Sequence, residues 1–284
     1  MKSDDRIIYA DLHTHSHYSD GANTPKKIVA LARKKSIKAL AISDHDNIEG
    51  QKEFIKEAND NQIIAIPAVE ITTSINKVRI HILGYFMDMN NKALMSYLNA
   101  LSKARTVNTQ KIFERLCNVG EIDYSWGKVL KYNEGRKWIS SLHVYNAMKA
   151  DKLINQSVSW LDFYFKYFSE KNLAYVDIDG FFPEDAIDYI KKAGGISIVA
   201  HPKLIHNDQE VEKMIKHGVD GIEVYYPAHT KSDILKYKQM AQKNNLIITG
   251  GSDFHGKDTG GYGILGEKGL TKEEFNNFMS NRKN

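Results

Sequence analysis

The first regular segment of the chain reads Ile7-Ile8-Tyr9-Ala10-Asp11-Leu12-His13-Thr14-His15, a largely apolar run that leads directly into two histidines. In an extended segment, side chains two positions apart lie on the same face, so both imidazoles can reach one ion. The spacing returns near the end of the chain in Gly251-Ser252-Asp253-Phe254-His255. Apolar runs that end in metal-ligating residue types predict strands that deliver their ligands to a common place.

Strand-like and helix-like segments alternate through the first ninety residues and again through the last third of the chain. The expected strands cover Ile7–Leu12, Ile37–Ser43, Ile63–Glu70, Val78–Tyr85, Ala174–Ile178, Ile196–Ala200, Gly221–Tyr225 and Leu246–Thr249. Thr24-Pro25 predicts a helix start, and Thr271 with Glu274 predicts a capping box for the last helix. This alternation favours an α/β sheet or barrel, and in parallel barrels the C-terminal strand ends meet at one mouth.

Residues 90–172 have a different pattern, with helical periodicity and no convincing strand. Helices are expected over Asn90–Asn118, Leu142–Asp151 and Ser157–Ser169. We therefore divide the chain into a barrel of residues 1–89 and 173–284 and a helical insertion subdomain of residues 90–172. The aromatic run from Trp160 to Phe168 is expected to form the core of the insertion, with a dimer face as the alternative reading.

Composition indicates a globular protein. The 284 residues are 42% hydrophobic and 26% charged, and the net charge is +4. The first six residues contain no apolar signal-peptide core, and no stretch approaches the length of a membrane span, so we expect a cytoplasmic protein with no membrane partner. The insertion holds 13 Lys and Arg against 7 Asp and Glu. This excess is either ordinary helix surface or a positive wall that attracts a phosphorylated substrate.

The candidate metal ligands are histidines and carboxylates beside the predicted strands: His13, His15, Asp20, His45, Glu70, His81, His201, Asp253 and His255. Neutral imidazole and carboxylate oxygen are the ligands that hold several divalent metals close together. Two of these residues have an alternative interpretation. His81 lies inside a predicted strand and is alternatively a hydrogen-bonded histidine of the core, and Asp20 is alternatively an ordinary turn residue. Asp44 and Asp46 flank His45, and either orient the ligands or cap the next helix.

In their order and spacing, these motifs resemble the PHP family, metal-dependent phosphoesterases named for polymerase-associated and histidinol-phosphatase members. The matching pieces are Asp11-Leu12-His13-Thr14-His15, Ser19-Asp20-Gly21, Ser43-Asp44-His45-Asp46, Glu70, His81-Ile82-Leu83-Gly84-Tyr85, Ala200-His201-Pro202 and Gly251-Ser252-Asp253-Phe254-His255-Gly256. The resemblance covers about residues 7–90 and 174–265.

The resemblance implies a distorted seven-stranded (β/α) TIM-like barrel with two to three divalent ions, which are manganese, iron or zinc. It assigns the ligands as follows: His13, His15 and Asp253 to the first ion, Glu70 as a bridge to the second, His81 and His201 to the second, and Asp20, His45 and His255 to the third. Sites made of imidazole and carboxylate do not select among these metals by residue type alone.

The helical insertion resembles that of family members that act on nucleotides. Those members carry an Arg-Pro-His motif at a helix start, where arginine and histidine contact the substrate phosphate. This chain has Ser140-Ser141-Leu142-His143 instead, so the histidine is present and the arginine is absent. Arg136, Lys137 or another basic residue of the insertion is the expected substitute.

The resulting expectation is an enzyme that hydrolyses phosphomonoesters of nucleotides or short oligonucleotides through a metal-bridging hydroxide. Asp20, His143 and His201 are the catalytic candidates, and His143 and Arg136 are the candidate substrate contacts. The alternatives are a phosphatase of histidinol phosphate or another small molecule, a non-catalytic nucleotide-binding protein stabilised by metal, and a C–N hydrolase of the related amidohydrolase barrels. The sequence leaves the substrate, metal and oligomeric state open.

Overall fold

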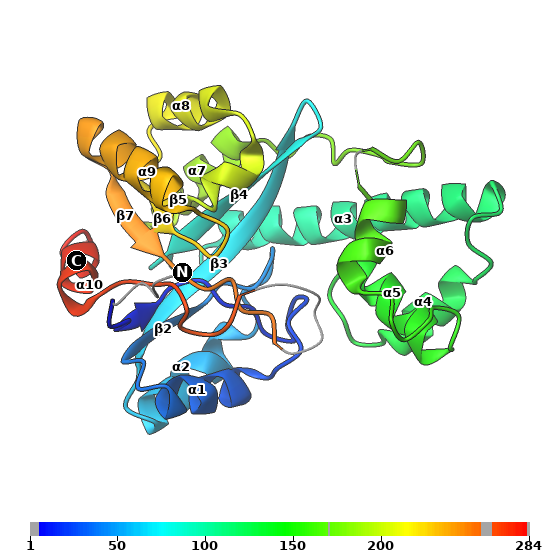
Figure 1. The fold of residues 1–284 in the computed structure, drawn as a ribbon, viewed down its shortest axis with the longest axis horizontal. Helices are drawn as coiled ribbons and strands as arrows, with labels where there is room; N and C mark the ends of the chain where they lie inside the picture. Colours follow the sequence, from blue (N-terminus) through cyan, green and yellow to red (C-terminus); the bar gives the residue numbers. More distant parts are fainter. Residues whose placement is uncertain (1–5, 170, 257–262, 283–284) are drawn as a thin grey trace.

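The computed structural model describes residues 6–169, 171–256 and 263–282, which form a seven-stranded sheet and its surrounding helices (Figure 1). The strands follow one another around the sheet in chain order: β1 (Ala10–Asp11), β2 (Ala39–Ile42), β3 (Ile64–Ile75), β4 (Val78–Tyr85), β5 (Ile196–Val199), β6 (Gly221–Tyr225) and β7 (Ile247–Gly250).

One reversed strand distorts an otherwise parallel barrel. β1, β2 and β3 are parallel, as are β5, β6 and β7, whereas β4 runs antiparallel to both β3 and β5. The first and last strands are joined by backbone bonds, in which Leu12 N–H donates to the Gly250 carbonyl over 3.2 Å and Asp253 N–H donates to the His13 carbonyl over 2.8 Å. The nearly closed, distorted barrel confirms the predicted fold class.

Six helices and a short 3₁₀ turn surround the sheet. They are α1 (Pro25–Lys34), α2 (Gln51–Asp60), α7 (Pro183–Lys192), η1 (Pro202–Ile205), α8 (Asp208–His217), α9 (Lys231–Lys243) and α10 (Lys272–Met279). The two predicted helix starts are confirmed, because Thr24 caps α1 and Thr271 forms the capping box of α10 with Glu274.

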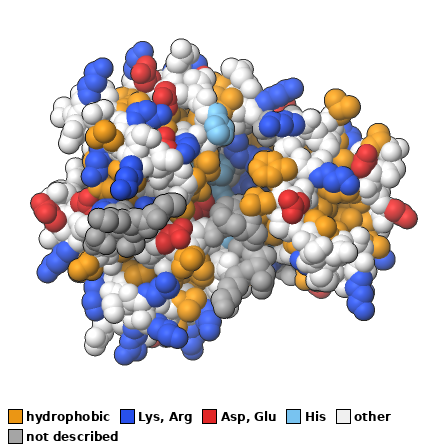
Figure 2. All heavy atoms as spheres, viewed as in Figure 1, with side chains coloured by type: hydrophobic (Ala, Val, Ile, Leu, Met, Phe, Trp, Pro, Cys, Tyr) orange, Lys and Arg blue, Asp and Glu red, His pale blue; other side chains and the backbone are white. Residues whose placement is uncertain are grey.

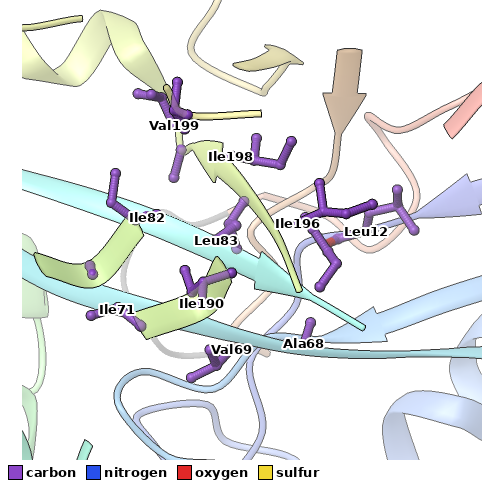
Figure 3. Close-up of a cluster of buried hydrophobic side chains, with 14 of the residues drawn as sticks. Leu12, Ala68, Val69, Ile71, Ile82, Leu83, Ile190, Ile196, Ile198 and Val199 are labelled. Atoms are coloured by element: carbon purple, nitrogen blue, oxygen red, sulfur yellow. The ribbon is translucent and has the colours of Figure 1, made fainter. Parts of the chain in front are cut away.

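The main core lies between the sheet and these helices. Figure 3 shows Ile71, Ile82 and Ile198 from neighbouring strands together with Ile190 of α7. All four side chains are fully buried. Removing such side chains from water is the main favourable contribution to folding. This core gives the strand ends a rigid support.

A second group of helices forms a lobe beside the barrel, joined to it by the long helix α3 (Figure 1). The group comprises α3 (Lys92–Asn118), α4 (Trp126–Tyr132), α5 (Ser141–Ala150) and α6 (Trp160–Tyr167). It has its own core, which includes Phe113, Leu142, Trp160, Phe163 and Phe168. The aromatic run is therefore only partly core, because Phe165 is 63% exposed.

The expected strand Ala174–Ile178 is wrong, because this segment forms no strand in the structure. The Asn108 side chain of α3 donates to the carbonyls of Val176 and Asp177, over 2.6 and 3.0 Å. The Asn108 side-chain amide thus donates to carbonyls that, in a strand, would accept hydrogen bonds from a neighbouring strand. Among the helices of the described ranges, none combines the length and the apolar character needed to cross a bilayer.

Candidate metal centre

The predicted ligands converge at one mouth of the barrel, although not all of them sit at strand ends. His13 and His15 follow β1, His45 follows β2, His201 follows β5, and Asp253 and His255 follow β7. Glu70 lies within β3, which continues to Ile75, and His81 lies within β4. The β3–β4 hairpin pairs Thr72 with His81 and so extends these two strands past the mouth.

The first cluster contains His13, His15, Glu70 and Asp253. All four side chains are buried, and one ligand atom from each lies within 4.8 Å of the others. His15 Nε2 is 3.1 Å from both Glu70 Oε2 and Asp253 Oδ1, and His13 Nε2 is 3.2 Å from Glu70 Oε2. These are the residues that the resemblance assigns to the first ion and to the bridge.

Two further clusters adjoin the first. One contains His45, Glu70 and His81, and the other contains His15, Asp20, His45 and His255. His201 also reaches the middle of the centre, since its Nε2 lies 3.0 Å from Glu70 Oε1. Each pair of clusters has one residue in common, which is His15, His45 or Glu70. Every predicted ligand thus belongs to one continuous group, in which His81 is partly exposed.

The donor set fits divalent cations. His13 Nε2, both ring nitrogens of His15, His81 Nε2 and His201 Nδ1 are buried and make no hydrogen bond of acceptable geometry with the described residues. A buried polar atom without a partner costs free energy, so such atoms usually have a ligand or water. Several neighbouring imidazole nitrogens in this state, with carboxylate oxygens between them, match the preferences of divalent transition metals.

The electrostatics of the cluster also favour cations. Burial opposes ionisation of Glu70, but the nearby charges of His13, His45 and His81 outweigh burial and hold its pKa well below the usual value. The pKa of Asp20 is likewise well below its usual value, because His255 and His45 outweigh burial. For His15, burial is outweighed by Asp253 and Glu70, which raise the pKa to about 10. The buried acids therefore remain charged and require positive partners.

A carboxylate that the sequence analysis missed, Glu223 of β6, orients two of the ligands. His13 Nδ1 donates to Glu223 Oε1 over 2.9 Å, and the His201 backbone N–H donates to Glu223 Oε2 over 2.7 Å. The first bond leaves Nε2 of His13 facing Glu70 and Asp253. Carboxylates that hold a metal-ligating imidazole in this way fix its tautomer and orientation. The sequence feature that could have identified Glu223 is the presence of an acidic residue inside the strand Gly221–Tyr225, which is fully buried.

Two other buried aspartates hold the loops that carry the ligands. Asp44 accepts bonds from the Ser16 N–H, the Ser16 hydroxyl and the Ser19 hydroxyl, over 2.6–2.7 Å. Asp11 accepts from the Ser252 N–H and hydroxyl, over 2.9 and 2.6 Å. Asp44 therefore anchors the loop before Asp20. Asp11 joins the first strand, β1, to the segment that follows the last strand, β7.

Asp46 connects the barrel mouth to the helical lobe. It accepts from the Thr72 N–H over 2.7 Å and forms an ion pair with Arg105 of α3. The Arg105 guanidinium also donates to Thr72 Oγ1 over 2.9 Å and lies 3.8 Å from the centre of the Trp138 ring. This places a cation from α3 beside the metal cluster.

Three residues of the site have left-handed backbone conformations. His201, Asp46 and Asp253 have φ values of +26°, +51° and +52°. Residues other than glycine rarely adopt such values, and where they do, the surrounding structure must hold them there. For His201, the bond to Glu223 helps to do so.

The predicted substrate contacts lie near the centre but have partners within the protein. His143 is buried, its Nδ1 accepts from the Ser140 N–H over 2.9 Å, and its ring packs edge-on against Trp138. Burial, reinforced by the charge of Arg136, lowers the pKa of His143 to about 4, so its ring is neutral at pH 7. Arg136 donates to the carbonyls of His17 and Ser19, and thus braces the Asp20 loop.

A cavity of about 360 Å³ opens between the metal cluster and the lobe. Figure 2 shows this hollow, with histidine and basic side chains inside it and hydrophobic side chains beside it. It is lined on the barrel side by Asp20, His45 and His81, and on the lobe side by Arg105, Ser140, Ser141 and aromatic residues of α6. Its size falls within the range of roughly 300–1,000 Å³ typical of small-molecule sites.

Comparison with known protein families identifies the fold and its centre. The model of the PHP domain matches residues 11–180, more than half of the chain. The chain belongs to the PHP family. Membership in this family, together with the buried cluster of metal-ligating residues, makes it a metal-dependent phosphoesterase.

Three curated PHP relatives align with most of the chain. Phosphoribosyl 1,2-cyclic phosphate 1,2-diphosphodiesterase of Eggerthella lenta is 26% identical over 87% of this chain and 94% of its own. The 3',5'-nucleoside bisphosphate phosphatase of Chromobacterium violaceum is 28% identical over 88% of both chains. A 5'-3' exoribonuclease of Haemophilus influenzae is 30% identical over 86% of this chain and 89% of its own.

A solved structure agrees with nearly all of this PHP protein. It is that of an inferred metal-dependent phosphoesterase from Bifidobacterium adolescentis, which superimposes with a TM-score of 0.86. The match covers 97% of this chain and 96% of the other at 27% identity. The similarity therefore extends through the helical lobe as well as the barrel.

Proposed function

We propose that this PHP protein hydrolyses phosphomonoesters of nucleotides or short oligonucleotides at the barrel mouth. The observation that carries the proposal is the continuous cluster of imidazoles and carboxylates around Glu70, which faces a cavity lined by Arg105 of the helical lobe and Arg79 of β4. The names of the relatives support a phosphorylated nucleotide or RNA substrate, since two of the three act on such molecules.

We propose that two to three ions of manganese, iron or zinc occupy the centre, with the ligand groups as the resemblance assigns them. His13, His15 and Asp253 would hold one ion, and Glu70 would bridge it to a second held by His81 and His201. Asp20, His45 and His255 would hold a third. When bound, such ions supply Lewis acidity toward the phosphoryl group and lower the pKa of water.

The protein's own residues would then position the substrate and handle the proton. Arg105 lines the cavity and is held there by Asp46 and Trp138, so it is the cation best placed to bind phosphate oxygens where the usual arginine is absent. Arg136 would act by bracing the Asp20 loop. His201 is a candidate proton donor to the leaving alcohol only where it is not committed to metal, and in that state its pKa is raised because Glu70 outweighs the effect of burial. His143 remains a candidate substrate contact because it lies at the start of α5.

The experiment measures phosphate release by protein loaded with Mn²⁺, Fe²⁺ or Zn²⁺. The substrates are an aryl phosphate, a nucleoside 3',5'-bisphosphate, a terminally phosphorylated trinucleotide and histidinol phosphate. We expect turnover of the nucleotide substrates to exceed that of histidinol phosphate, and Glu70→Gln to reduce turnover at least about 100-fold. Absence of phosphate release from every substrate with every metal would refute the proposal.

A matched variant controls for general damage to the protein. Glu212 lies exposed on α8, and Glu212→Gln makes the same chemical change outside the centre. This variant should keep the turnover of the unmodified protein. Equal loss in Glu212→Gln and Glu70→Gln would show that the loss reports stability rather than the metal centre.

A further inference from the structure

A second cavity adjoins the one at the metal centre. It has a volume of about 440 Å³ and lies between the β3–β4 hairpin, η1 and α6. The two cavities share five lining residues, namely Arg79, His81, Tyr164, Phe165 and Leu204. They therefore form one groove that runs from the metal cluster past α6 toward the tip of the hairpin.

The chemistry of the outer part of this groove is aromatic and basic. Phe165 is 63% exposed, and the Tyr164 hydroxyl lies 3.5 Å from Arg79 Nη1, which places a cation beside Tyr164. Lys77 and His206 also line the second cavity, and both are exposed. Its described lining residues include no carboxylate. An exposed ring with adjacent cations is suited to a base and its phosphate.

The exposure of Phe165 needs an explanation. Its neighbours in the aromatic run, Phe163 and Phe168, are buried in the core of the lobe. Phe165 instead contributes its ring to both cavities and lies edge-on to Tyr164, at 5.5 Å between ring centres. The α6 helix therefore buries one aromatic face in its core and presents another to the groove.

We propose that this groove binds the end of a single-stranded oligonucleotide at least two nucleotides long. The inference rests on the proposed function, because the terminal phosphate lies at the metal centre. The adjacent nucleotide occupies the second cavity, with its base against Phe165 and Tyr164 and its phosphate near Arg79 and Lys77. Each cavity alone is of a size to accept about one nucleotide.

The test compares kcat/KM for a terminally phosphorylated trinucleotide with that for a small alkyl phosphate that has no ring. Base–aromatic stacking is worth roughly 1–3 kcal/mol, so Phe165→Ala should lower the trinucleotide value about 5- to 100-fold. The alkyl phosphate value should stay within about twofold, because that substrate has nothing to stack on Phe165 and does not reach the second cavity. Phe165→Trp should restore the trinucleotide value. Equal effects on both substrates, or no effect on the trinucleotide, would overturn the inference.

The matched control is Tyr132→Ala. Tyr132 is 54% exposed on α4 and lines neither cavity, so its removal should change neither substrate. A further variant, Arg79→Ala, should weaken trinucleotide binding. It should also reduce the slope of the logarithm of the binding constant against the logarithm of the salt concentration by about 0.7, the value for one lost phosphate contact.

A binding measurement tests the groove independently of the proposed enzyme activity. Fluorescence anisotropy with a labelled trinucleotide requires no turnover, and Phe165→Ala should raise Kd about 5- to 100-fold whereas Tyr132→Ala should not. Loss of binding in Phe165→Ala without any phosphate release by the unmodified protein would refute the enzyme but support the groove. Unchanged binding in Phe165→Ala would refute the groove, whatever the turnover.

Discussion

At the scale of single residues, the metal centre depends on groups that orient its ligands as well as on the ligands. Glu223 illustrates this, because one of its oxygens holds the His13 ring and the other holds the backbone of His201. Both contacts are fully buried, so no water can replace the carboxylate without rearrangement. We infer that Glu223 fixes two candidate metal ligands whose rings stack on each other, at 5.8 Å between ring centres.

We expect Glu223→Gln to lower the affinity for Mn²⁺ or Zn²⁺ about 10- to 100-fold, because loss of such an orienting carboxylate has effects of this size. Competition against a chromophoric chelator measures the change. The exposed Glu212→Gln on α8 is the control and should bind as tightly as the unmodified protein. An unchanged metal affinity in Glu223→Gln would mean that His13 and His201 keep their orientation without the Glu223 carboxylate.

The candidate ligands are easier to recognise in the sequence than the residues that support them. Candidate ligands such as His13 and Asp253 stand out because they follow apolar runs at a recognisable spacing. Glu223 and Arg105 do not, because their partners are distant in the chain and only the folded barrel brings them together. The alternative of an orienting role, left open for Asp44 and Asp46, is consistent with their contacts to Ser16 and Thr72.

At the scale of elements, the capping box of α10 also joins three parts of the barrel. The Glu274 carboxylate accepts from the Thr271 N–H over 2.9 Å and contacts Arg6 and the Tyr225 hydroxyl. Burial opposes ionisation of Glu274, but the bonds from Tyr225 and Thr271 and the charge of Arg6 outweigh it and lower its pKa. Because the folded-state pKa is below the unfolded value, this interaction stabilises the fold above about pH 4.5.

We expect Glu274→Gln to lower the free energy of unfolding at pH 7 by about 1 kcal/mol, the usual contribution of a helix cap. The difference from the unmodified protein should narrow as the pH falls below about 4.5, because the native carboxylate is then protonated as well. Urea unfolding of metal-free protein at pH 7 and pH 4 measures both values. A difference that grows at pH 4 would contradict the sign of the pKa shift.

Element prediction succeeded where local signals were strong. The caps at Thr24 and Thr271 and the long helix ending at Asn118 were readable because capping and periodicity are local properties. The segment Ala174–Ile178 was mispredicted, because its alternating pattern serves packing against the lobe and contacts with Asn108 rather than strand pairing. Helix α4 is short and was not predicted.

At the scale of the whole molecule, the barrel and the helical lobe each have a hydrophobic core of their own, and both support one centre. The barrel core and the lobe core are separate clusters, and α3 passes between them. We propose, on this basis, that residues 90–172 form a subdomain inserted into a barrel of residues 1–89 and 173–284. The candidate ligands span residues 13 to 255, so bound ions would connect most of the barrel.

We expect metal to stabilise the whole barrel. At a free metal concentration about 100 times Kd, one bound ion adds roughly 2.7 kcal/mol to the free energy of unfolding. For a chain of this size, that corresponds to a rise in Tm of roughly 5–10 °C. Calorimetry of metal-loaded and chelated protein measures the shift. Glu70→Gln should show a smaller shift, and an identical shift in this variant would place the stabilising metal elsewhere.

The most direct measurement is the number of divalent ions bound per chain, determined by elemental mass spectrometry after reconstitution and removal of free metal. We predict two to three ions for the unmodified protein and at least one fewer for Glu70→Gln, since Glu70 lies between the clusters. Less than one ion per chain in the unmodified protein, or the same number in Glu70→Gln, would contradict a shared metal centre at the barrel mouth.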